Sequence, residues 1–411
     1  MSTVALFTSE PFVVDGDRSL LTRSKFDTIS LMSEPFDEVI IYSTHKNIGE
    51  EKTNYYNLPV KYKCESIGRF DESSKLKRMF RMVKDGLLFF KRTRKVDVVY
   101  TRIPMWDAYI PSLMALLLGR KRYVSLHGDI EEALEIALKG KSPLFRNALI
   151  FLMGKLTRVI VNNADLLFVS GPELQKKYAP KKKNVVPFLD SGYLAKDIVK
   201  GVPKIKQENI IKLLYVGELV ERKGIVYLLG AVRELATQGY AVELSLIGTG
   251  DSELYKTIAK EYGIAELVNF KGYVPYGPEL FEEYRKADIM VLPSIGTEGW
   301  SRVIVEANVN GIPVITTEVG SLGHAVREFN NGLVVDKESG AAIAGAIKEI
   351  VNDRDLHASL VEGAFQRANK YCVEKELTKI WAAIQGTYPD VVGKPPSDPE
   401  KLCPGAKLSL A

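Results

Sequence analysis

Two glutamates in the second half of the chain, Glu298 and Glu306, stand eight residues apart in a segment whose order suggests a phosphate site. A Pro-Ser pair precedes them and a Gly-Ile-Pro segment follows them. This order predicts a strand, a loop with Glu298, and a helix that begins near Ser301 and carries Glu306 on its second turn. The first backbone N–H groups of such a helix attract an anion. We expect Gly299, Trp300, Ser301 and Arg302 around this helix start. Two solvated glutamates on an ordinary helix would show the same spacing, and a hydrolase pair is not required by it.

Glycines and cations precede this segment. Gly217 ends an apolar run, and Arg222 and Lys223 follow shortly, directly before another glycine. Cations fixed at such a turn would stabilise the charge of a departing phosphate. A glycine pair, Gly248 and Gly250, ends a further apolar run, but position 253 is Glu where a dinucleotide fingerprint has its third glycine. A nicotinamide enzyme is therefore disfavoured.

The first half offers one histidine at the end of an apolar run. His127 follows residues 123–126 and precedes Gly128 and Asp129. A single histidine after a strand is as compatible with a structural role as with a ligand contact. The residues alone therefore leave both roles open.

The elements expected to position these residues alternate between two kinds. Short runs rich in β-branched residues predict buried strands at 4–7, 39–42, 98–101, 123–126 and 166–169, and again at 213–216, 244–247, 289–292, 314–316 and 333–335. Amphipathic stretches predict helices at 20–33, 75–93 and 107–118, then at 225–237, 252–261, 302–310 and 341–352. This alternation is typical of an α/β fold with doubly wound parallel sheets, and it occurs twice.

The second occurrence predicts a second domain. The polar, non-periodic segment 200–209 predicts the join, giving a domain at 1–204 and another at 205–372. We expect a helix at 373–387 that packs back on the first domain, and a weakly ordered, proline-rich tail at 388–411. Ligands of such paired domains bind at the carboxyl ends of the strands, in the cleft between the domains.

Charge divides unevenly along the chain. The net charge is +5, with +10 in residues 1–200 and −5 in residues 201–411. Residues 69–95 contribute ten cations and three acids, and their apolar residues recur at helical spacing. A solvated basic face explains this pattern, and an interfacial helix on anionic lipid is the sharper alternative. Nucleic acid is the least favoured partner because no recognition motif accompanies the charge.

Three cysteines, Cys64, Cys372 and Cys403, are widely spaced and suit a reducing compartment. The first residues lack the basic flank of a signal peptide, and no apolar run reaches the ~18 residues that span a bilayer. We therefore expect a cytoplasmic protein, either free or peripheral on the inner face of the cytoplasmic membrane.

Six segments of the second half, in order, resemble the retaining nucleotide-sugar glycosyltransferases of the GT-B fold known as glycosyltransferase family 4. They are 215–217 with 222–224, then 246–250, 269–274, 287–289, the E-x7-E element with its flanks at 293–314, and 331–334. In the first half, residues 97–102 and His127 also fit. The resemblance implies two Rossmann-like domains that face a central cleft.

The resemblance also implies roles for matching positions. Lys223 would bind the donor diphosphate, Glu298 and His127 would contact the donor sugar, and Glu306 would hydrogen-bond the ribose hydroxyls. The donor side would be completed by Gly217, Arg222, Gly248, Gly250, Val274, Gly299, Trp300, Ser301 and Arg302. The acceptor side would include Asp15, Gly16, Arg102, Gly128 and Asp129. No metal or other cofactor would be needed.

The expected function is transfer of a hexose from a UDP- or GDP-sugar to a saccharide or lipid-linked acceptor, in surface polysaccharide or glycolipid synthesis. Two departures from the family pattern bear on this. Glu218 stands where members usually carry Arg, and the loop 8–17 has one glycine where many members have a pair. An epimerase or sugar-phosphate synthase on the same fold, or a non-catalytic nucleotide-sugar binding protein, are the alternatives.

Overall fold

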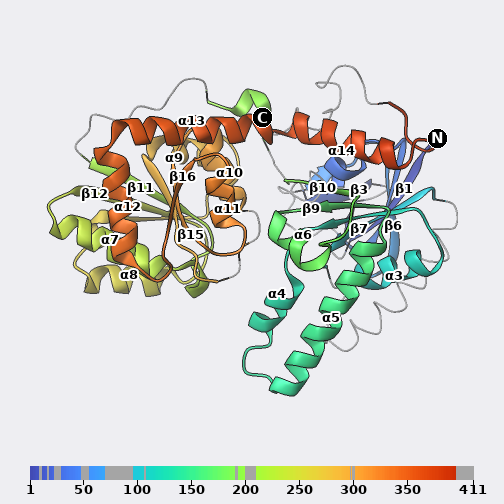
Figure 1. Ribbon diagram of the computed structural model, residues 1–411, viewed down its shortest axis with the longest axis horizontal. Helices are drawn as coiled ribbons and strands as arrows, with labels where there is room; N and C mark the ends of the chain where they lie inside the picture. Colours follow the sequence, from blue (N-terminus) through green and yellow to red (C-terminus); the bar gives the residue numbers. More distant parts are fainter. Residues whose placement is uncertain are drawn as a thin grey trace. The chain divides into compact units, whose positions relative to one another are not determined.

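The computed structural model describes residues 1–8, 12–15, 18–22, 29–47, 55–69, 96–105, 108–189, 193–199, 210–296, 298 and 301–394. The described residues form two compact units (Figure 1). The first contains the described residues of 1–189 and 374–394, and the second contains those of 193–373. Each unit combines helices with a largely parallel sheet, so the predicted α/β class is confirmed.

The sheet of the first unit, over its described residues, has the order β10-β9-β8-β7-β1-β4-β2-β3-β5, with β6 beside β4. Its parallel strands are β1 (Thr3–Phe7), β4 (Glu38–Asn47), β6 (Tyr62–Arg69), β7 (Val98–Ile103), β8 (Arg122–Leu126), β9 (Leu166–Val169) and β10 (Val185–Pro187). All five strands expected from apolar runs in the first half are among them. Strands such as β9 are buried at every residue. Because both faces of such a strand are covered, its sequence is a continuous apolar run and does not alternate with polar residues.

One edge of this sheet differs from expectation. β2 (Phe12–Asp15), β3 (Arg18–Thr22) and β5 (Tyr55–Asn57) extend it, and β3 runs antiparallel to both β2 and β5. The predicted helix at 20–33 is therefore wrong over its first turn, and residues 29–33 are its described helical part. Leu20 and Leu21 are buried in β3, where pairing with neighbouring strands overrides the helical spacing.

Besides residues 29–33, the described helices of the first unit are α3 (Tyr109–Leu117), α4 (Ile130–Ala137), α5 (Pro143–Asn163), α6 (Pro172–Tyr178) and α14 (Val373–Thr387). The core between β7–β9 and helices α3 to α6 contains buried apolar residues such as Val124, Leu126 and Leu167. The helix expected at 75–93 lies outside the described residues, as does most of the basic stretch 69–95.

The second unit has a parallel sheet with the order β13-β12-β11-β14-β15-β16. Its strands are β11 (Ile210–Val216), β12 (Ala241–Ile247), β13 (Val268–Gly272), β14 (Ile289–Leu292), β15 (Val314–Thr317) and β16 (Gly332–Val335). Its main helices are α7 (Ile225–Thr237), α8 (Ser252–Glu261), α9 (Pro278–Lys286), α10 (Arg302–Val309), α11 (Leu322–Arg327), α12 (Gly340–Asn352) and α13 (Arg354–Lys370). The chain moves outward from β11 to β13 and then returns to β14 on the other side of β11. This reversal makes the carboxyl ends of β11 and β14 the topological switch point, where ligands of such sheets bind.

The chain passes from one unit to the other twice. The first passage lies at Asp190/Ser191, before the expected join at 204/205, and the second lies at Val373/Glu374. Helix α14 belongs to the first unit, where the buried Glu376 accepts a hydrogen bond from the Leu189 N–H at 3.2 Å. The tail at 395–411 lies outside the described residues. No helix in the described parts is both long enough and apolar enough to span a bilayer.

Candidate active site

The centre of the candidate site is an ion pair between Lys223 and Glu298. Lys223 ends a short 3-10 turn after β11, and Glu298 lies in the loop after β14. The Lys223 Nζ lies 2.5 Å from the Glu298 Oε1, and both side chains are largely buried. The Ser294 hydroxyl donates to the same oxygen at 2.7 Å. Two predicted site residues from separate loops are therefore held together at the switch point of the sheet.

Gly224 makes this arrangement sterically possible. Its φ is +68°, a left-handed conformation that side chains rarely adopt, and a Cβ would lie 2.1 Å from the Pro293 carbonyl oxygen. The two loops also share backbone hydrogen bonds, because the Arg222 carbonyl accepts from the N–H groups of Ile295 and Gly296. The β11 and β14 loops therefore form one connected support.

Arg222 lies beside this ion pair and contacts two carboxylates. Its Nη2 donates to Glu218 at 2.8 Å, and its Nη1 lies 3.5 Å from Glu298. Glu218 occupies the position where the family pattern has Arg, and its carboxylate contacts Arg222, four residues later in the chain. The Tyr215 hydroxyl donates to the Glu218 carbonyl at 2.7 Å, and burial, followed by the charge of Glu298, raises the pKa of Tyr215.

Glu306 lies on the second turn of α10, as predicted. It accepts a hydrogen bond from the Tyr284 hydroxyl of α9 at 2.9 Å. Burial raises the pKa of Glu306 to about 7, although the Tyr284 hydrogen bond and the charge of Arg302 act in the other direction. At the start of α10, the Ser301 side chain makes no capping hydrogen bond and the first turn has no acidic residue. This helix start suits an anionic ligand, and Gly299 and Trp300 lie outside the described residues.

The predicted glycines lie at the ends of β11 and β12. A Cβ on Gly248 would come within 1.9 Å of the Gly217 carbonyl oxygen, and one on Gly250 within 2.4 Å of the Leu219 carbonyl oxygen. The two loops therefore pack backbone against backbone. Beside them is a pocket of about 360 Å³, within the usual range for small-molecule sites, lined by Leu219, Gly248, Thr249, Gly250, Ser252, Lys256, Phe270, Gly272 and Tyr273. Val274 follows this lining directly.

In the first unit, His127 is held by a chain of hydroxyl groups. The His127 Nε2 lies 2.9 Å from the Ser125 hydroxyl, which lies 2.7 Å from the Tyr100 hydroxyl. Ser125 and Tyr100 are both buried, and the His127 ring contacts the edge of Phe188. Because residues i and i+2 of a strand share a face, Ser125 lies on the same side of β8 as the histidine that follows the strand. The Ser125 hydroxyl on β8 therefore orients the His127 ring.

The other predicted residues of the first unit lie on several elements. Arg102 lies on β7 opposite Ser125 in the strand register. A Cβ on Gly128 would make only an ordinary contact of 3.6 Å with Pro104. Asp15 lies in β2, and Gly16 lies outside the described residues.

Asp129 has a structural role in this loop. It caps α4 by accepting from the Glu131 and Glu132 N–H groups, and it also accepts from Lys177 at 2.6 Å and Tyr178 at 2.5 Å. Burial opposes its charge, but the bonds from Lys177 and Tyr178 outweigh it and leave the pKa of Asp129 below its ordinary value. The carboxylate therefore fixes the loop that carries His127 and the start of α4.

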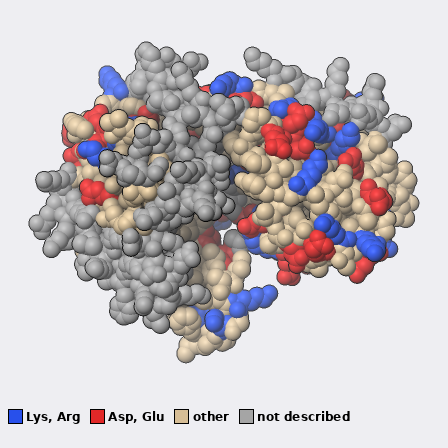
Figure 2. All heavy atoms as spheres, turned by 180° about the vertical axis from the view of Figure 1, so that it is seen from behind, with Lys and Arg blue, Asp and Glu red and all other residues tan. Residues whose placement is uncertain are grey.

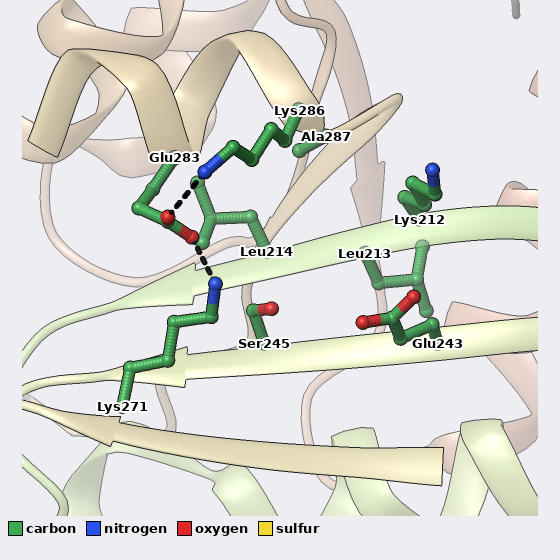
Figure 3. Close-up of a pocket in the computed structure, with 9 residues that line it drawn as sticks. All are labelled: Lys212, Leu213, Leu214, Glu243, Ser245, Lys271, Glu283, Lys286 and Ala287. Carbon is green, nitrogen blue, oxygen red and sulfur yellow. Dashed lines mark hydrogen bonds and ion pairs between the residues drawn. The ribbon is translucent and has the colours of Figure 1, made fainter. Parts of the chain in front are cut away.

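A second pocket of the second unit lies away from this site, between α9 and the sheet (Figure 3). Its volume of about 130 Å³ is below the usual size of a ligand site. Glu283 of α9 points down to Lys271 of β13, with which it forms an ion pair, and it pairs with Lys286 at 2.9 Å. The charges that line this pocket tie α9 to the sheet, and we assign them a structural role.

Sequence reasoning missed three polar partners. Ser294 and Ser125 had weak signals, since one belongs to the Pro-Ser pair and the other lies two residues before His127 in a strand. Tyr284 had no signal, because it is 22 residues from Glu306 and reaches it only through the packing of α9 on α10.

Comparison with known proteins identifies the family and the fold. A family model described as glycosyl transferases group 1 matches residues 199–367. An uncharacterized glycosyltransferase of Methanocaldococcus jannaschii is 30% identical over 330 residues, which cover 79% of this chain and 84% of that protein. Protein CapJ of Staphylococcus aureus is 25% identical over 299 residues, covering 71% of this chain and 73% of CapJ. Among solved structures, HepE of Anabaena, in complex with UDP-glucose, shares the fold with a TM-score of 0.63 at 16% identity, over 94% of this chain and 100% of that one.

Proposed function

This chain belongs to the glycosyl transferases group 1 family and is a glycosyltransferase with the GT-B fold, and we propose that it transfers a sugar from a nucleoside diphosphate sugar to an acceptor hydroxyl with retention of anomeric configuration. The observation that carries this proposal is the placement of Arg222 and Lys223 beside Glu298 at the switch point of the second unit. Two cations there match a diphosphate, and UDP-glucose bound to HepE supports a nucleotide sugar as donor.

The proposed reaction breaks the bond between the sugar C1 and the diphosphate oxygen and forms a bond from C1 to the acceptor oxygen. The acceptor proton passes to the departing diphosphate on the same face of the sugar. Lys223, Arg222 and the first N–H groups of α10 stabilise the charge that develops on the diphosphate. Glu298 and His127 orient the sugar, and Glu306 accepts hydrogen bonds from the ribose. No metal is required by this proposal, since side-chain cations balance the leaving charge.

Glu218 modifies this scheme without removing a cation. Its carboxylate cannot neutralise phosphate, but its 2.8 Å bond to Arg222 holds that guanidinium near Glu298. We propose that Arg222 supplies the charge that the family pattern takes from position 218. A non-catalytic protein that only binds a nucleotide sugar is the alternative that Glu218 favours.

We propose a saccharide or lipid-linked acceptor, in surface polysaccharide or glycolipid synthesis on the inner face of the cytoplasmic membrane. The base and sugar of the donor are left to a screen of UDP- and GDP-sugars by nucleotide release, with and without saccharide acceptors. A nucleotide sugar that is bound but never turned over would favour the binding-protein alternative. A free sugar epimer formed without acceptor would favour an epimerase.

The site itself is tested by Lys223→Ala. Loss of a cation that stabilises the leaving diphosphate is expected to lower kcat/KM about 100-fold or more. Lys348→Ala is the matched control, because Lys348 lies on α12 and pairs with Glu234 at 3.6 Å in the same unit. Circular dichroism of both variants checks the fold. Equal activity of Lys223→Ala and the control would refute the site.

A further inference from the structure

Helices α4 and α5 form a hairpin that extends beyond the sheet of the first unit (Figure 1). We define this hairpin as residues 130–163. Its root is fixed by the Asp129 cap and by an ion pair at 2.9 Å between Glu131 of α4 and Arg158 of α5. The buried residues of α5 begin at Met153, so its first ten residues bury no side chain. In this part of α5 only one side of the helix, at Leu149 and Ile150, packs partly against the core.

This part of α5 is nevertheless apolar. Leu144 is 83% exposed, Phe145 57%, Phe151 63% and Leu152 52%. Their spacing of i, i+1, i+7 and i+8 places them on one side of α5, opposite the side that is buried further along the helix. Contiguous exposed apolar side chains of this size mark an interaction surface.

The charges around this face have one sign. Between Glu135 and Asp165 the chain has five Lys or Arg residues and no acid. Arg158 is paired at the root, and the other four are Lys139, Lys141, Arg146 and Lys155. Figure 2 shows the end of the hairpin as tan surface with blue cationic groups. The Lys155 Nζ lies 4.6 Å from the Phe151 ring centroid, so its stem lies along the apolar face.

We propose that the hairpin docks on an anionic lipid bilayer, with the exposed face of α5 in the interface and the lysines against headgroup phosphates. Apolar residues surrounded by Lys and Arg fit such an interface. A second copy of the chain fits poorly, because a two-fold contact would bring like charges together. The helix is suited to lie on the bilayer and not to span it, since its charged residues interrupt its apolar length.

The position of the hairpin links this surface to the acceptor and rests on the proposed function. His127 and Gly128 lie directly before α4, whose eight residues extend for about 12 Å. A docked hairpin would hold the His127 loop close to the headgroups. The acceptor class that fits is a hydroxyl carried on a membrane lipid.

The test uses the full chain and vesicles of phosphatidylcholine alone or with 30% phosphatidylglycerol, about that of an anionic bilayer surface. Leu144→Ser with Phe145→Ser is expected to lower binding to the mixed vesicles at least tenfold. Leu117→Ser with Leu118→Ser is the matched control, an adjacent exposed pair on α3 of the same unit. Lys139→Glu with Lys141→Glu is expected to remove the preference for anionic vesicles, whereas Lys181→Glu with Lys183→Glu, the same charge change elsewhere, is expected to keep it.

Three results would overturn the proposal. They are no binding of the unaltered chain, equal binding of the Leu144/Phe145 variant and its control, or a dimer of the unaltered chain that this variant converts to a monomer without any change in vesicle binding. Light scattering on the protein as it elutes from a size-exclusion column distinguishes the dimer from the monomer. Calorimetry with UDP separates this proposal from the proposed function, because the hairpin variants are expected to bind UDP like the unaltered chain. Vesicle binding without any binding of UDP or GDP would leave the surface intact and refute the donor site.

Discussion

Glu306 shows how burial changes the chemistry of one side chain. With a pKa of about 7, its carboxyl is half-protonated near neutral pH. The Tyr284 hydroxyl already donates to one of its oxygens. In the proposed role, ribose hydroxyls bond more strongly to the carboxylate than to the acid, so nucleotide binding would displace this proton.

This predicts pH-dependent nucleotide affinity. UDP affinity is expected to rise from pH 6 to pH 8 as Glu306 ionises, and binding near pH 7 is expected to release protons. Calorimetry in buffers of different ionisation enthalpy measures both. Glu306→Gln is the control, because the titration of UDP itself is common to both proteins. An identical pH profile in the two would contradict the assignment.

The same shift has a consequence for stability with a defined sign. The folded-state pKa of Glu306 exceeds the ordinary value of 4.5, so its favourable contribution is present at acid pH and is lost as pH rises to about 7. Relative to Glu306→Gln, the unaltered chain should therefore lose stability across this range.

Ser125 is a positioning residue in this structure, and its removal tests the hydroxyl chain to His127. Loss of one neutral hydrogen bond is expected to lower kcat about 2- to 10-fold with little change in KM. It should also move the pH profile of kcat, because the imidazole loses the Ser125 hydroxyl as a partner of its Nε2. Ser125→Thr should restore both.

The control for Ser125→Ala is Tyr109→Phe. It removes a buried hydrogen bond of 2.7 Å, to Thr157, in the same unit without touching the bond to His127. An equal effect of the two variants on the pH profile would show a merely structural role for Ser125.

At the scale of elements, the loop after β11 depends on one glycine. Gly224→Ala is expected to strain a left-handed residue and to push a Cβ against the Pro293 carbonyl. Gly263→Ala is the matched control, since its φ is +71° and a Cβ there meets nothing within 4 Å. The control should lose about 1–2 kcal/mol of unfolding free energy from backbone strain alone.

Gly224→Ala should lose more stability than this control and also lose transfer activity, because Lys223 is the preceding residue. Denaturant unfolding and nucleotide release measure the two effects. Equal stability losses would mean that the two loops separate freely and do not form one support.

Most elements were predictable from the sequence, and the reason is local. Helices α7 and α8 begin and end where their apolar spacing and glycine or cap residues placed them, at 225–237 and 252–261. The β3 edge was missed although a local signal exists, because the Asp15-Gly16 pair just before Arg18 is typical of a β-hairpin. β3 pairs antiparallel with the neighbouring β2, and its second partner, β5, is more than 30 residues away in sequence.

The site followed the same rule. Loop residues that carry charge, such as Lys223 and Glu298, were predictable because their types and neighbours suit a phosphate. Their ion pair was not, since it depends on β11 and β14 lying side by side in the sheet. Partners such as Tyr284 depend on packing between helices and leave no pattern in the sequence.

At the scale of the whole molecule, the first unit depends on residues from both ends of the chain. In α14, Leu377 is 4% exposed and Ile380 and Ile384 are fully buried. Each such side chain contributes about 1.5–3 kcal/mol when it is buried. Asn184 and Asp165, which flank β9 and β10, also contact Thr387 and Tyr388.

Removal of residues 374–411 is therefore expected to expose β9 and β10 to hydrogen exchange and to leave β11 and β14 protected. Removal of residues 395–411 alone is the control and should leave all four strands protected. Exchange measured by mass spectrometry on peptides from these strands distinguishes the outcomes. Full protection of β9 and β10 in the shorter chain would show that α14 is dispensable.

The double passage of the chain between units also determines the order in which the two units are completed during synthesis. All described residues of the second unit's core emerge from the ribosome before α14, which the first unit still lacks at that point. Domains generally fold as units during synthesis, in the order in which they are completed. Here the middle of the chain is completed before its beginning. The first unit cannot complete its core until α14 emerges. Until then, the surface that Ile380 and Ile384 will cover is exposed to water and to chaperones.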